Sequence, residues 1–261
     1  MPLFDEVFNR ANIYDMLFFN IKAVLTYPTL LELLEKNPAL YKRWKYISKS
    51  KYDVDIQDET PDTNETYLEN AIYYPEFTKI VTITYASLTS ENGQLKRFFK
   101  KIENEDEYLV IATFMDVLHQ LSSEGIKSTP KFFPILCGHN IINYDIPLLT
   151  KRFILYRDKF EHNKQLPYIL KNALNTKPWE STVMDTVSIW KFNGNNYTPL
   201  MLIADFLNLK KTVDLDKLSD VSKNYWKHFE DNPEEAFNYI SLQSATQTNL
   251  VIQLINELRQ L

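Results

Sequence analysis

The stretch LCGHNIINYDIPLLTKR, residues 136–152, decides the fold that this sequence predicts. It continues an apolar run that predicts a strand over 132–137, and it passes through a polar turn into an apolar helix. We place the start of the helix near Asp145-Ile146-Pro147, because proline fits the first helical turn, where its missing N–H loses no partner. Asp145 then lies at the carboxyl end of a buried strand, where open α/β sheets place ligand sites. The alternative is that Asp145 only caps the helix.

Hydrophobic periodicity on both sides of this stretch predicts the remaining elements. Residues 16–24 and 79–85 are apolar or alternating, and each predicts a strand, as does the short run 182–186. Residues 94–100 follow a glycine-containing turn and predict the second strand of a hairpin. The segment 53–65 is acidic and nearly free of apolar residues, so we expect a solvated loop. Helical spacing occurs in 29–35, 38–47, 105–121, 146–160, 187–191, 199–207 and 233–261.

Composition limits the class of protein. A chain of 261 residues with 44% hydrophobic residues can bury a sizeable core, and no apolar run approaches the roughly 20 residues that span a bilayer. We therefore expect no membrane partner, and the N-terminus does not predict a signal peptide. A single cysteine, Cys137, excludes an internal disulfide and a cysteine-based metal site, so we expect the cytoplasm. The net charge of −5 counts against a nucleic-acid binder, and 4 glycines leave no glycine-rich phosphate loop.

The pattern G-H-N-I-x-x-Y-D-I-P-x-L-x-x-R over residues 138–152 resembles the second exonuclease motif of the DnaQ-like (DEDD) 3′–5′ exonucleases. It is most similar to bacterial predicted 3′–5′ exonucleases related to the exonuclease domain of family B DNA polymerases. The likeness continues through residues 16–24, 74–83, 177–192 and 239–254. It implies an α/β fold in one domain over 1–261, with a ribonuclease H-like mixed sheet flanked by helices. It also implies a helical insertion over 26–76, after the first strand.

The resemblance implies a metal site in which this chain has different residues at several ligand positions. The family holds two Mg²⁺ or Mn²⁺ ions with four carboxylates, because hard cations prefer oxygen ligands. The first family motif, F-x-D-x-E, reads FFNIK here, so Asn20 and Lys22 stand at its acidic positions on one strand face. Asp145 matches the family aspartate of the second motif. The last motif, Y-x-x-x-D, keeps Tyr239 but has Gln243 in place of the aspartate.

Three of the four carboxylates are therefore replaced, and the formal charge of the site falls from about −4 to zero. The ammonium of Lys22 would repel a dication ~4 Å away by several kcal/mol, even at an effective dielectric near 20. We expect no metal cofactor and no two-metal catalysis. Two roles for Lys22 remain open: a buried ion pair with Asp145, or a contact to the phosphate of a bound nucleic-acid end.

Further candidates surround these positions. We assign nucleic-acid contacts to His139, Asn140, Lys151 and Arg152, although a solvated helix face is the alternative for the last two. Stacking on bases is one use for Trp179, Trp190, Tyr197 and Trp226, and packing in the core is the other. We expect Asp185 to cap the helix that follows it and not to bind metal.

Three functions remain open at this stage. The first is a catalytically degenerate exonuclease homologue, a pseudoenzyme that binds single-stranded DNA or RNA ends without cutting them. The second is a protein-interaction or scaffold module, which the acidic balance of the chain favours. The third is a weakly active exonuclease that uses one metal through Asp145, with Tyr239 orienting the attacking water.

Overall fold

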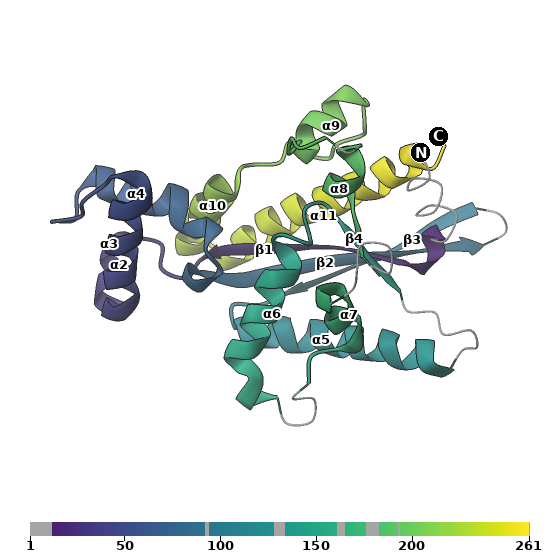
Figure 1. The fold of residues 1–261 in the computed structure, drawn as a ribbon, viewed down its shortest axis with the longest axis horizontal. Helices are drawn as coiled ribbons and strands as arrows, with labels where there is room; N and C mark the ends of the chain where they lie inside the picture. Colours follow the sequence, from purple (N-terminus) through teal and green to yellow (C-terminus); the bar gives the residue numbers. More distant parts are fainter. Residues whose placement is uncertain are drawn as a thin grey trace. The chain divides into compact units, whose positions relative to one another are not determined.

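The computed structural model describes residues 12–91, 94–127, 134–160, 165–175, 183–192 and 194–260. Within them a five-stranded sheet has the strand order β3-β2-β1-β4-β5 (Figure 1). The strands are β1 Met16–Leu25, β2 Thr78–Glu91, β3 Gln94–Glu103, β4 Ile135–Gly138 and β5 Val183–Asp185. β4 runs parallel to β1 and to β5, whereas β2 and β3 form an antiparallel hairpin, so the sheet is mixed. The expected α/β class with a mixed sheet and flanking helices is confirmed.

The helices follow the order α2 Leu30–Lys36, α3 Pro38–Tyr52, α4 Pro61–Asn70, α5 Glu107–Lys127, α6 Asp145–Tyr156, α7 Tyr168–Asn175, α8 Thr186–Trp190, α9 Leu200–Phe206, α10 Leu218–Asp231 and α11 Pro233–Leu258. Short 3-10 turns occupy η1 Ile13–Asp15, η2 Ala71–Tyr73, η3 Pro75–Phe77 and η4 Arg157–Lys159. Among the described residues, no helix combines the length and apolarity needed to cross a membrane.

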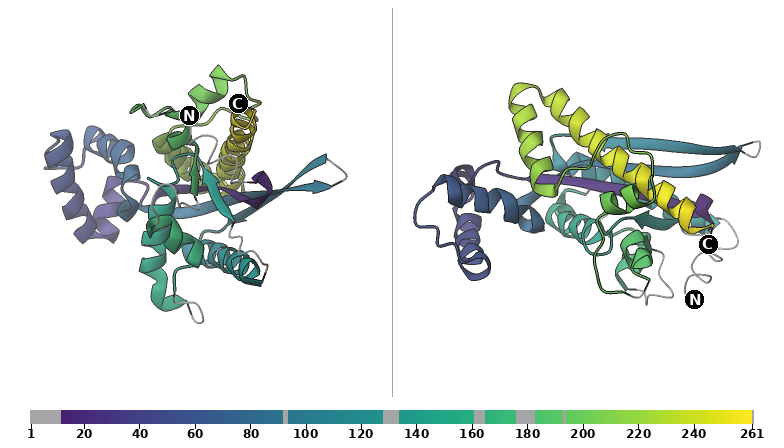
Figure 2. Two further views of the ribbon diagram at one scale, coloured as in Figure 1. Left: turned by 45° about the vertical axis from the view of Figure 1, so that its right-hand side comes forward. Right: turned by 90° about the horizontal axis from the view of Figure 1, so that it is seen from above.

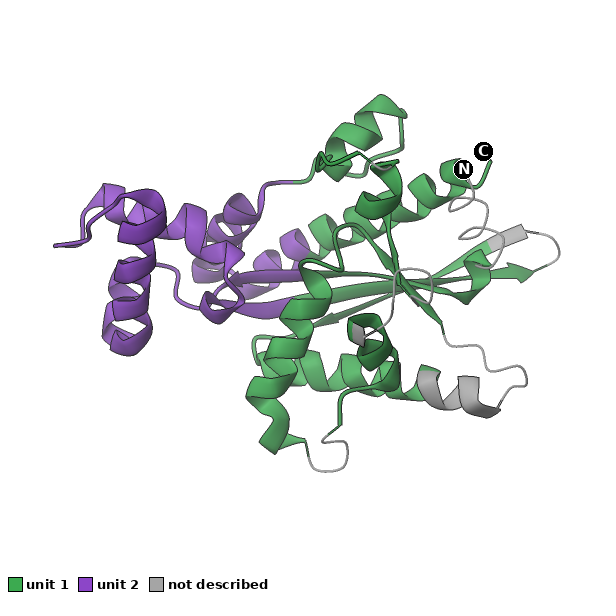
Figure 3. Ribbon diagram, viewed as in Figure 1, with its two compact units in different colours: residues 1–21, 82–215, 241–261 green, residues 22–81, 216–240 purple. Residues whose placement is uncertain are grey.

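The chain divides into two compact units (Figure 3). Unit 1 comprises residues 1–21, 82–215 and 241–261, and unit 2 comprises 22–81 and 216–240. Because these boundaries fall inside β1, β2 and α11, each of those three elements contributes residues to both units.

In unit 1, helices cover both faces of the sheet. α5, α6 and α7 lie on one face, and α8, α9 and the C-terminal part of α11 lie on the other (Figures 1 and 2). The alternation of side chains along β1 explains this arrangement. Phe18 belongs to the core formed with Leu250 and Leu254 of α11, whereas the ring of Phe19 lies 5.8 Å from that of Phe114 on α5. Both phenylalanines are buried, so β1 is a central strand.

Gly138 ends β4 where the chain passes very close to β1. A Cβ atom at this position would lie 2.3 Å from Cγ2 of Ile141 and 3.0 Å from the carbonyl oxygen of Phe19. The second neighbour is backbone and cannot rotate away, so only glycine fits. The turn that leads to Asp145 is thereby held against β1.

In unit 2, helices α2, α3 and α4 enclose an aromatic cluster. Trp44 is fully buried, and its ring lies 5.6 Å from those of both Tyr67 and Phe77 in edge-to-face geometry. Such pairs contribute about 0.5–1.5 kcal/mol each beyond the area that they bury.

The prediction of a solvated loop over residues 53–65 is partly wrong. Thr60 and Thr63 form a reciprocal capping box, and α4 starts at Pro61, inside the predicted loop. Ile56 is fully buried in the same cluster as Trp44, so the segment is anchored where the composition indicated solvent. The burial of Ile56 and the capping box at Thr60 therefore order this segment despite its acidic composition.

Each of the other predicted helices and strands corresponds to a helix or strand in the structure, and the predicted ends differ from the observed ends. The helix predicted over 146–160 divides into α6 and the turn η4. Residues 132, 133 and 182 of the predicted strands lie outside the described residues. α7 and α10 were not predicted.

Candidate functional site

Asp145 is the first residue of α6, and it connects that helix to the middle of β1. Its carboxylate Oδ1 accepts a hydrogen bond of 2.8 Å from the backbone N–H of Ile21. The N-cap residue of α6 is Tyr144, which makes no side-chain capping bond, so the interpretation of Asp145 as merely the cap is wrong. With only 2% of its surface exposed, Asp145 is a buried carboxylate on α6 that contacts the strand carrying the first motif.

Asn20, the residue before Ile21, is buried and directed toward α11. Its Oδ1 accepts a hydrogen bond of 3.0 Å from the hydroxyl of Ser244. The hydroxyl of Ser244 also lies 2.7 Å from that of Thr84 on β2, which in turn lies 3.0 Å from that of Thr248. Neutral buried groups thus form a hydrogen-bonded network linking β1, β2 and α11.

Gln243 adjoins this network on α11. It is buried, and its Nε2 donates a hydrogen bond of 3.1 Å to the backbone carbonyl of Asp214. Asp145 bonds the residue after Asn20, and Asn20 bonds the residue after Gln243. Segments of all three motifs therefore lie beside β1 in unit 1.

The remaining two site residues belong to unit 2. Lys22 is 4% exposed and follows Asn20 by two residues on β1, so the strand period directs both side chains to one face. The hydroxyl of Tyr239 donates to the carboxylate of Asp216 and accepts a bond of 3.2 Å from Nδ2 of Asn224. Burial, followed by the bond to Asp216, raises the pKa of Tyr239, so its hydroxyl stays protonated at neutral pH.

The donor set at these positions differs from that of a two-metal centre, which needs several carboxylates around each pair of ions. Asp145 supplies one carboxylate, and the amide groups of Asn20 and Gln243 are engaged in internal hydrogen bonds. Over the part of the chain that the structure describes, no group of three or more His, Cys, Asp or Glu side chains is arranged to hold a metal ion.

Asp185 organises the loop between β4 and α6. Its carboxylate accepts hydrogen bonds of 2.8 Å from the N–H of Asn140, 3.0 Å from that of Ile142 and 2.9 Å from that of Val187. The last bond caps α8, so the predicted cap is confirmed. Burial raises the pKa of Asp185, and the three backbone N–H groups oppose that shift. Asn140 is held at φ 64°, a left-handed conformation that asparagine tolerates.

His139 lies at the same edge of the sheet as a buried, neutral ring. Its Nδ1 is 2.9 Å from the hydroxyl of Thr186, and burial lowers the pKa of His139 to about 4. An uncharged imidazole lacks the positive charge that attracts phosphate, so the structure does not support an ionic contact from His139 to phosphate. That ring lies 6.0 Å from the ring of Tyr197, which is 56% exposed.

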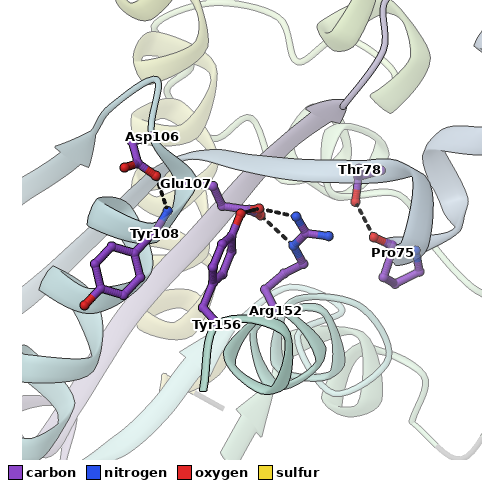
Figure 4. A network of polar contacts seen from close by, with 7 residues as sticks. All are labelled: Pro75, Thr78, Asp106, Glu107, Tyr108, Arg152 and Tyr156. Atoms are coloured by element: carbon purple, nitrogen blue, oxygen red, sulfur yellow. Dashed lines mark hydrogen bonds and ion pairs between the residues drawn. The ribbon is translucent and has the colours of Figure 1, made fainter. Parts of the chain in front are cut away.

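Arg152 is engaged by a partner that the sequence did not reveal. Its Nε donates a hydrogen bond of 2.7 Å to Oε1 of Glu107, and a second N–H of the guanidinium bonds Oε2 (Figure 4). The hydroxyl of Tyr156 donates to the same carboxylate at 2.9 Å. The side chains of Glu107 and Arg152 are only 3% and 11% exposed. The neighbouring Lys151 is exposed, as a solvated helix face requires.

The aromatic candidates separate into core and surface residues. Trp226 is half-buried in unit 2, where its Nε1 donates to the carbonyl of Leu25 at 2.9 Å. Trp190 packs against the core of unit 1, and Trp179 lies outside the described residues. Tyr197 is the candidate with an exposed ring.

Comparison of the chain with protein-family models, with curated proteins and with solved structures finds no match. The resemblance to exonucleases therefore remains a prediction from the motif residues.

Proposed function

We propose that this chain is a 3′–5′ exonuclease-like protein that has lost two-metal hydrolysis and binds single-stranded nucleic-acid ends without cutting them. The observation that carries the proposal is the bond from the N–H of Ile21 to the carboxylate of Asp145. It joins the second motif to the first motif at the residue between Asn20 and Lys22. Motifs more than a hundred residues apart in sequence are adjacent in the fold, as a site built from them requires.

The fold supports the same proposal. A mixed sheet of order β3-β2-β1-β4-β5 with helices on both faces is compatible with a ribonuclease H-like domain. The helices between β1 and β2 correspond in sequence to the insertion that we infer over residues 26–76. Fold alone does not specify function, so the proposal depends mainly on the residues of the candidate site.

Loss of catalysis follows from the chemistry of the substitutions. Amide oxygens are weaker ligands for Mg²⁺ than carboxylates, and a lysine ammonium repels a dication. The Oδ1 of Asn20, the atom that would bind an ion, already accepts a hydrogen bond from Ser244, and the amide nitrogen of Gln243 donates to the carbonyl of Asp214. We infer that the chain needs no metal cofactor.

The test compares the natural chain with the triple revertant Asn20→Asp, Lys22→Glu, Gln243→Asp. Each is incubated with a 5′-labelled single-stranded oligonucleotide and Mg²⁺ or Mn²⁺, and the products are resolved by length. We expect no digestion by the natural chain and a ladder of shortened products with the revertant. The matched control adds Asp145→Asn to the revertant and should abolish the ladder. Digestion by the natural chain would instead establish the weakly active, one-metal enzyme.

The second candidate is a protein-interaction module that has abandoned nucleic acid. The net charge of −5 favours it, since nucleic-acid binding requires cationic groups near phosphates. Oligonucleotide binding in EDTA, measured over a range of salt concentrations, separates the two. A natural chain that binds with an affinity falling as salt rises supports the first candidate, and a chain that binds at no salt concentration supports the second.

A further inference from the structure

An exposed surface of unit 1 combines aromatic rings with lysines. We call it the aromatic–basic surface and define it by Lys191, Phe192, Tyr197, Phe206 and Lys210. Phe192, Tyr197 and Phe206 are 46%, 56% and 73% exposed, so three aromatic rings are available to a ligand on this surface. The surface is formed by α8, α9 and the segments that follow them, on the same side of the sheet as α11 (Figure 1).

The exposed rings are anchored from below. Trp190 packs against the core of unit 1, and its ring lies 6.0 Å from that of Phe192 and 6.2 Å from that of Phe206. Lys210 is fixed as well, because the side-chain amide of Gln253 on α11 both accepts from its N–H and donates to its carbonyl, each at 2.9 Å. Anchoring of this kind reduces the entropy lost when a ligand binds.

The surface begins at the carboxyl ends of β4 and β5, next to the candidate site. The ring of Tyr197 lies 6.0 Å from that of His139, which directly follows β4. Lys191 lies close enough to Asp185, the last residue of β5, to lower the pKa of that carboxylate. A ligand on the surface would therefore extend toward the loop that leads from β4 to Asp145.

The charge of this part of the chain is opposite to that of the whole. Residues 186–211 contain three lysines and one acidic residue, Asp205, whereas the complete chain has a net charge of −5. Lys211 forms ion pairs with Asp205 and Asp214, so the lysines that we assign to the ligand are Lys191 and Lys210. In sequence order the two lysines lie on either side of the three rings.

We propose that the aromatic–basic surface binds single-stranded nucleic acid, with bases stacked on the three exposed rings and phosphates near the two lysines. Proteins that bind single strands combine these two kinds of group, because every base has a stacking face and every nucleotide a phosphate. A protein partner fits less well, since lysine is depleted in protein–protein interfaces. The inference rests on the proposed function and adds where the strand lies.

The experiment measures binding of a fluorescent 12-nucleotide oligothymidylate to the full chain by anisotropy, in EDTA and at several salt concentrations. Tyr197→Ala and Phe206→Ala should each raise the Kd roughly 5- to 150-fold, the range expected for loss of one stacked base. Lys191→Gln should weaken binding and reduce the slope of log affinity against log salt by about 0.7. Tyr197→Phe keeps the ring and should bind like the natural chain.

Two matched controls lie on α3 in unit 2. Tyr46 is 73% exposed, the same fraction as Phe206, and Lys42 is also exposed. Tyr46→Ala and Lys42→Gln should leave the affinity and the salt dependence unchanged. Circular dichroism verifies that each variant is folded at the temperature of the measurement.

The outcomes separate this inference from the proposed function. If the natural chain binds the oligonucleotide and the aromatic variants bind equally well, the inference is wrong and the proposed function stands. If the natural chain does not bind at any salt concentration, both are wrong. If the aromatic variants change the sedimentation of the free chain from dimer to monomer, the surface is an interface between copies and the inference is overturned.

Discussion

Removal of the Arg152 guanidinium is the sharpest test of the structure, because two explanations of this residue predict different results. In the structure Arg152 neutralises the buried carboxylate of Glu107, whereas the sequence made it a candidate for phosphate contact. The change Arg152→Leu keeps apolar volume on α6 and removes the charge. Glu107 then remains as a carboxylate with a 3% exposed side chain and with the hydroxyl of Tyr156 still donating to it.

The expected loss of stability follows from the contacts. Arg152 supplies two charge-assisted hydrogen bonds, each of which contributes about 1.5–3 kcal/mol. Breaking a buried ion pair by removing one partner costs about 3–5 kcal/mol, which agrees with the sum of the two bonds. The remaining bond from Tyr156 places the expected value at the lower end, about 3 kcal/mol. For a chain of this size that corresponds to a fall in Tm of roughly 6–12 °C.

The measurement is urea unfolding of the full chain followed by circular dichroism, with Arg157→Leu as the control. Arg157 follows α6 directly, its side chain is 59% exposed, and its nearest carboxylate oxygen, on Asp158, is 3.8 Å away. Its removal should change the free energy of unfolding by no more than about 0.5 kcal/mol. The double change Glu107→Leu, Arg152→Leu should be more stable than Arg152→Leu alone, because no buried charge is left unpaired.

Two results would refute this reasoning. A loss below about 1 kcal/mol for Arg152→Leu, comparable to that of an exposed pair, would mean that the pair is not buried in solution. Unchanged stability together with weaker, less salt-dependent oligonucleotide binding would assign the guanidinium to a phosphate, as the resemblance implies.

Three further predictions concern the candidate site. Because the pKa of His139 is about 4 in the folded chain and near 6.5 in the unfolded chain, the free energy of unfolding should fall by about 3 kcal/mol as pH drops from 7 to 4, relative to a His139→Gln variant measured by urea unfolding. Gly138→Ala should cost about 1–3 kcal/mol in the same assay, because its Cβ would overlap Ile141 and the carbonyl of Phe19; a neutral effect would contradict the close approach. The triple revertant should unfold at a lower temperature than the natural chain in EDTA and gain thermal stability with Mn²⁺, whereas the natural chain should show no Mn²⁺ effect.

The sequence predicted the strands of the sheet well because their signal is local. β1 is apolar apart from Asn20 and Lys22, and the sequence between β2 and β3 contains glycine, so each strand is visible without its neighbours. α10 is different: Ser219 and Ser222 are buried in it, and the hydroxyl of Ser222 accepts a hydrogen bond of 2.9 Å from the N–H of Leu25. Buried serines weaken the apolar periodicity on which a sequence-based helix prediction depends.

In the candidate site, too, residues defined by a local motif could be predicted and long-range partners could not. The motifs marked Asn20, Asp145 and Gln243, since each position is defined within a few residues of its own motif, and the structure places residues next to Asn20 in hydrogen-bond contact with Asp145 and residues next to Gln243 in contact with Asn20. Glu107 could not be identified, because its partner Arg152 is 45 residues away and no pattern around Glu107 marks it as buried. Long-range ion pairs of this kind are specified by the tertiary fold and leave no periodic trace in the sequence.

The proposed loss of catalysis gives one physical reason for the substitutions at Asn20, Lys22 and Gln243. Four carboxylates around one point repel one another unless cations are bound or some are protonated, so replacing three of them removes a destabilising repulsion from a metal-free chain. In this chain the amide oxygen of Asn20 accepts a hydrogen bond from Ser244, and the amide nitrogen of Gln243 donates one to the carbonyl of Asp214. The carboxylate of Asp145 accepts one from the N–H of Ile21. Each of these three side chains therefore satisfies a hydrogen bond of the protein itself. Under the proposed function, the chain exchanged a metal-dependent centre for one that is stable without metal, and the oligonucleotide experiments decide whether the aromatic–basic surface is where nucleic acid binds.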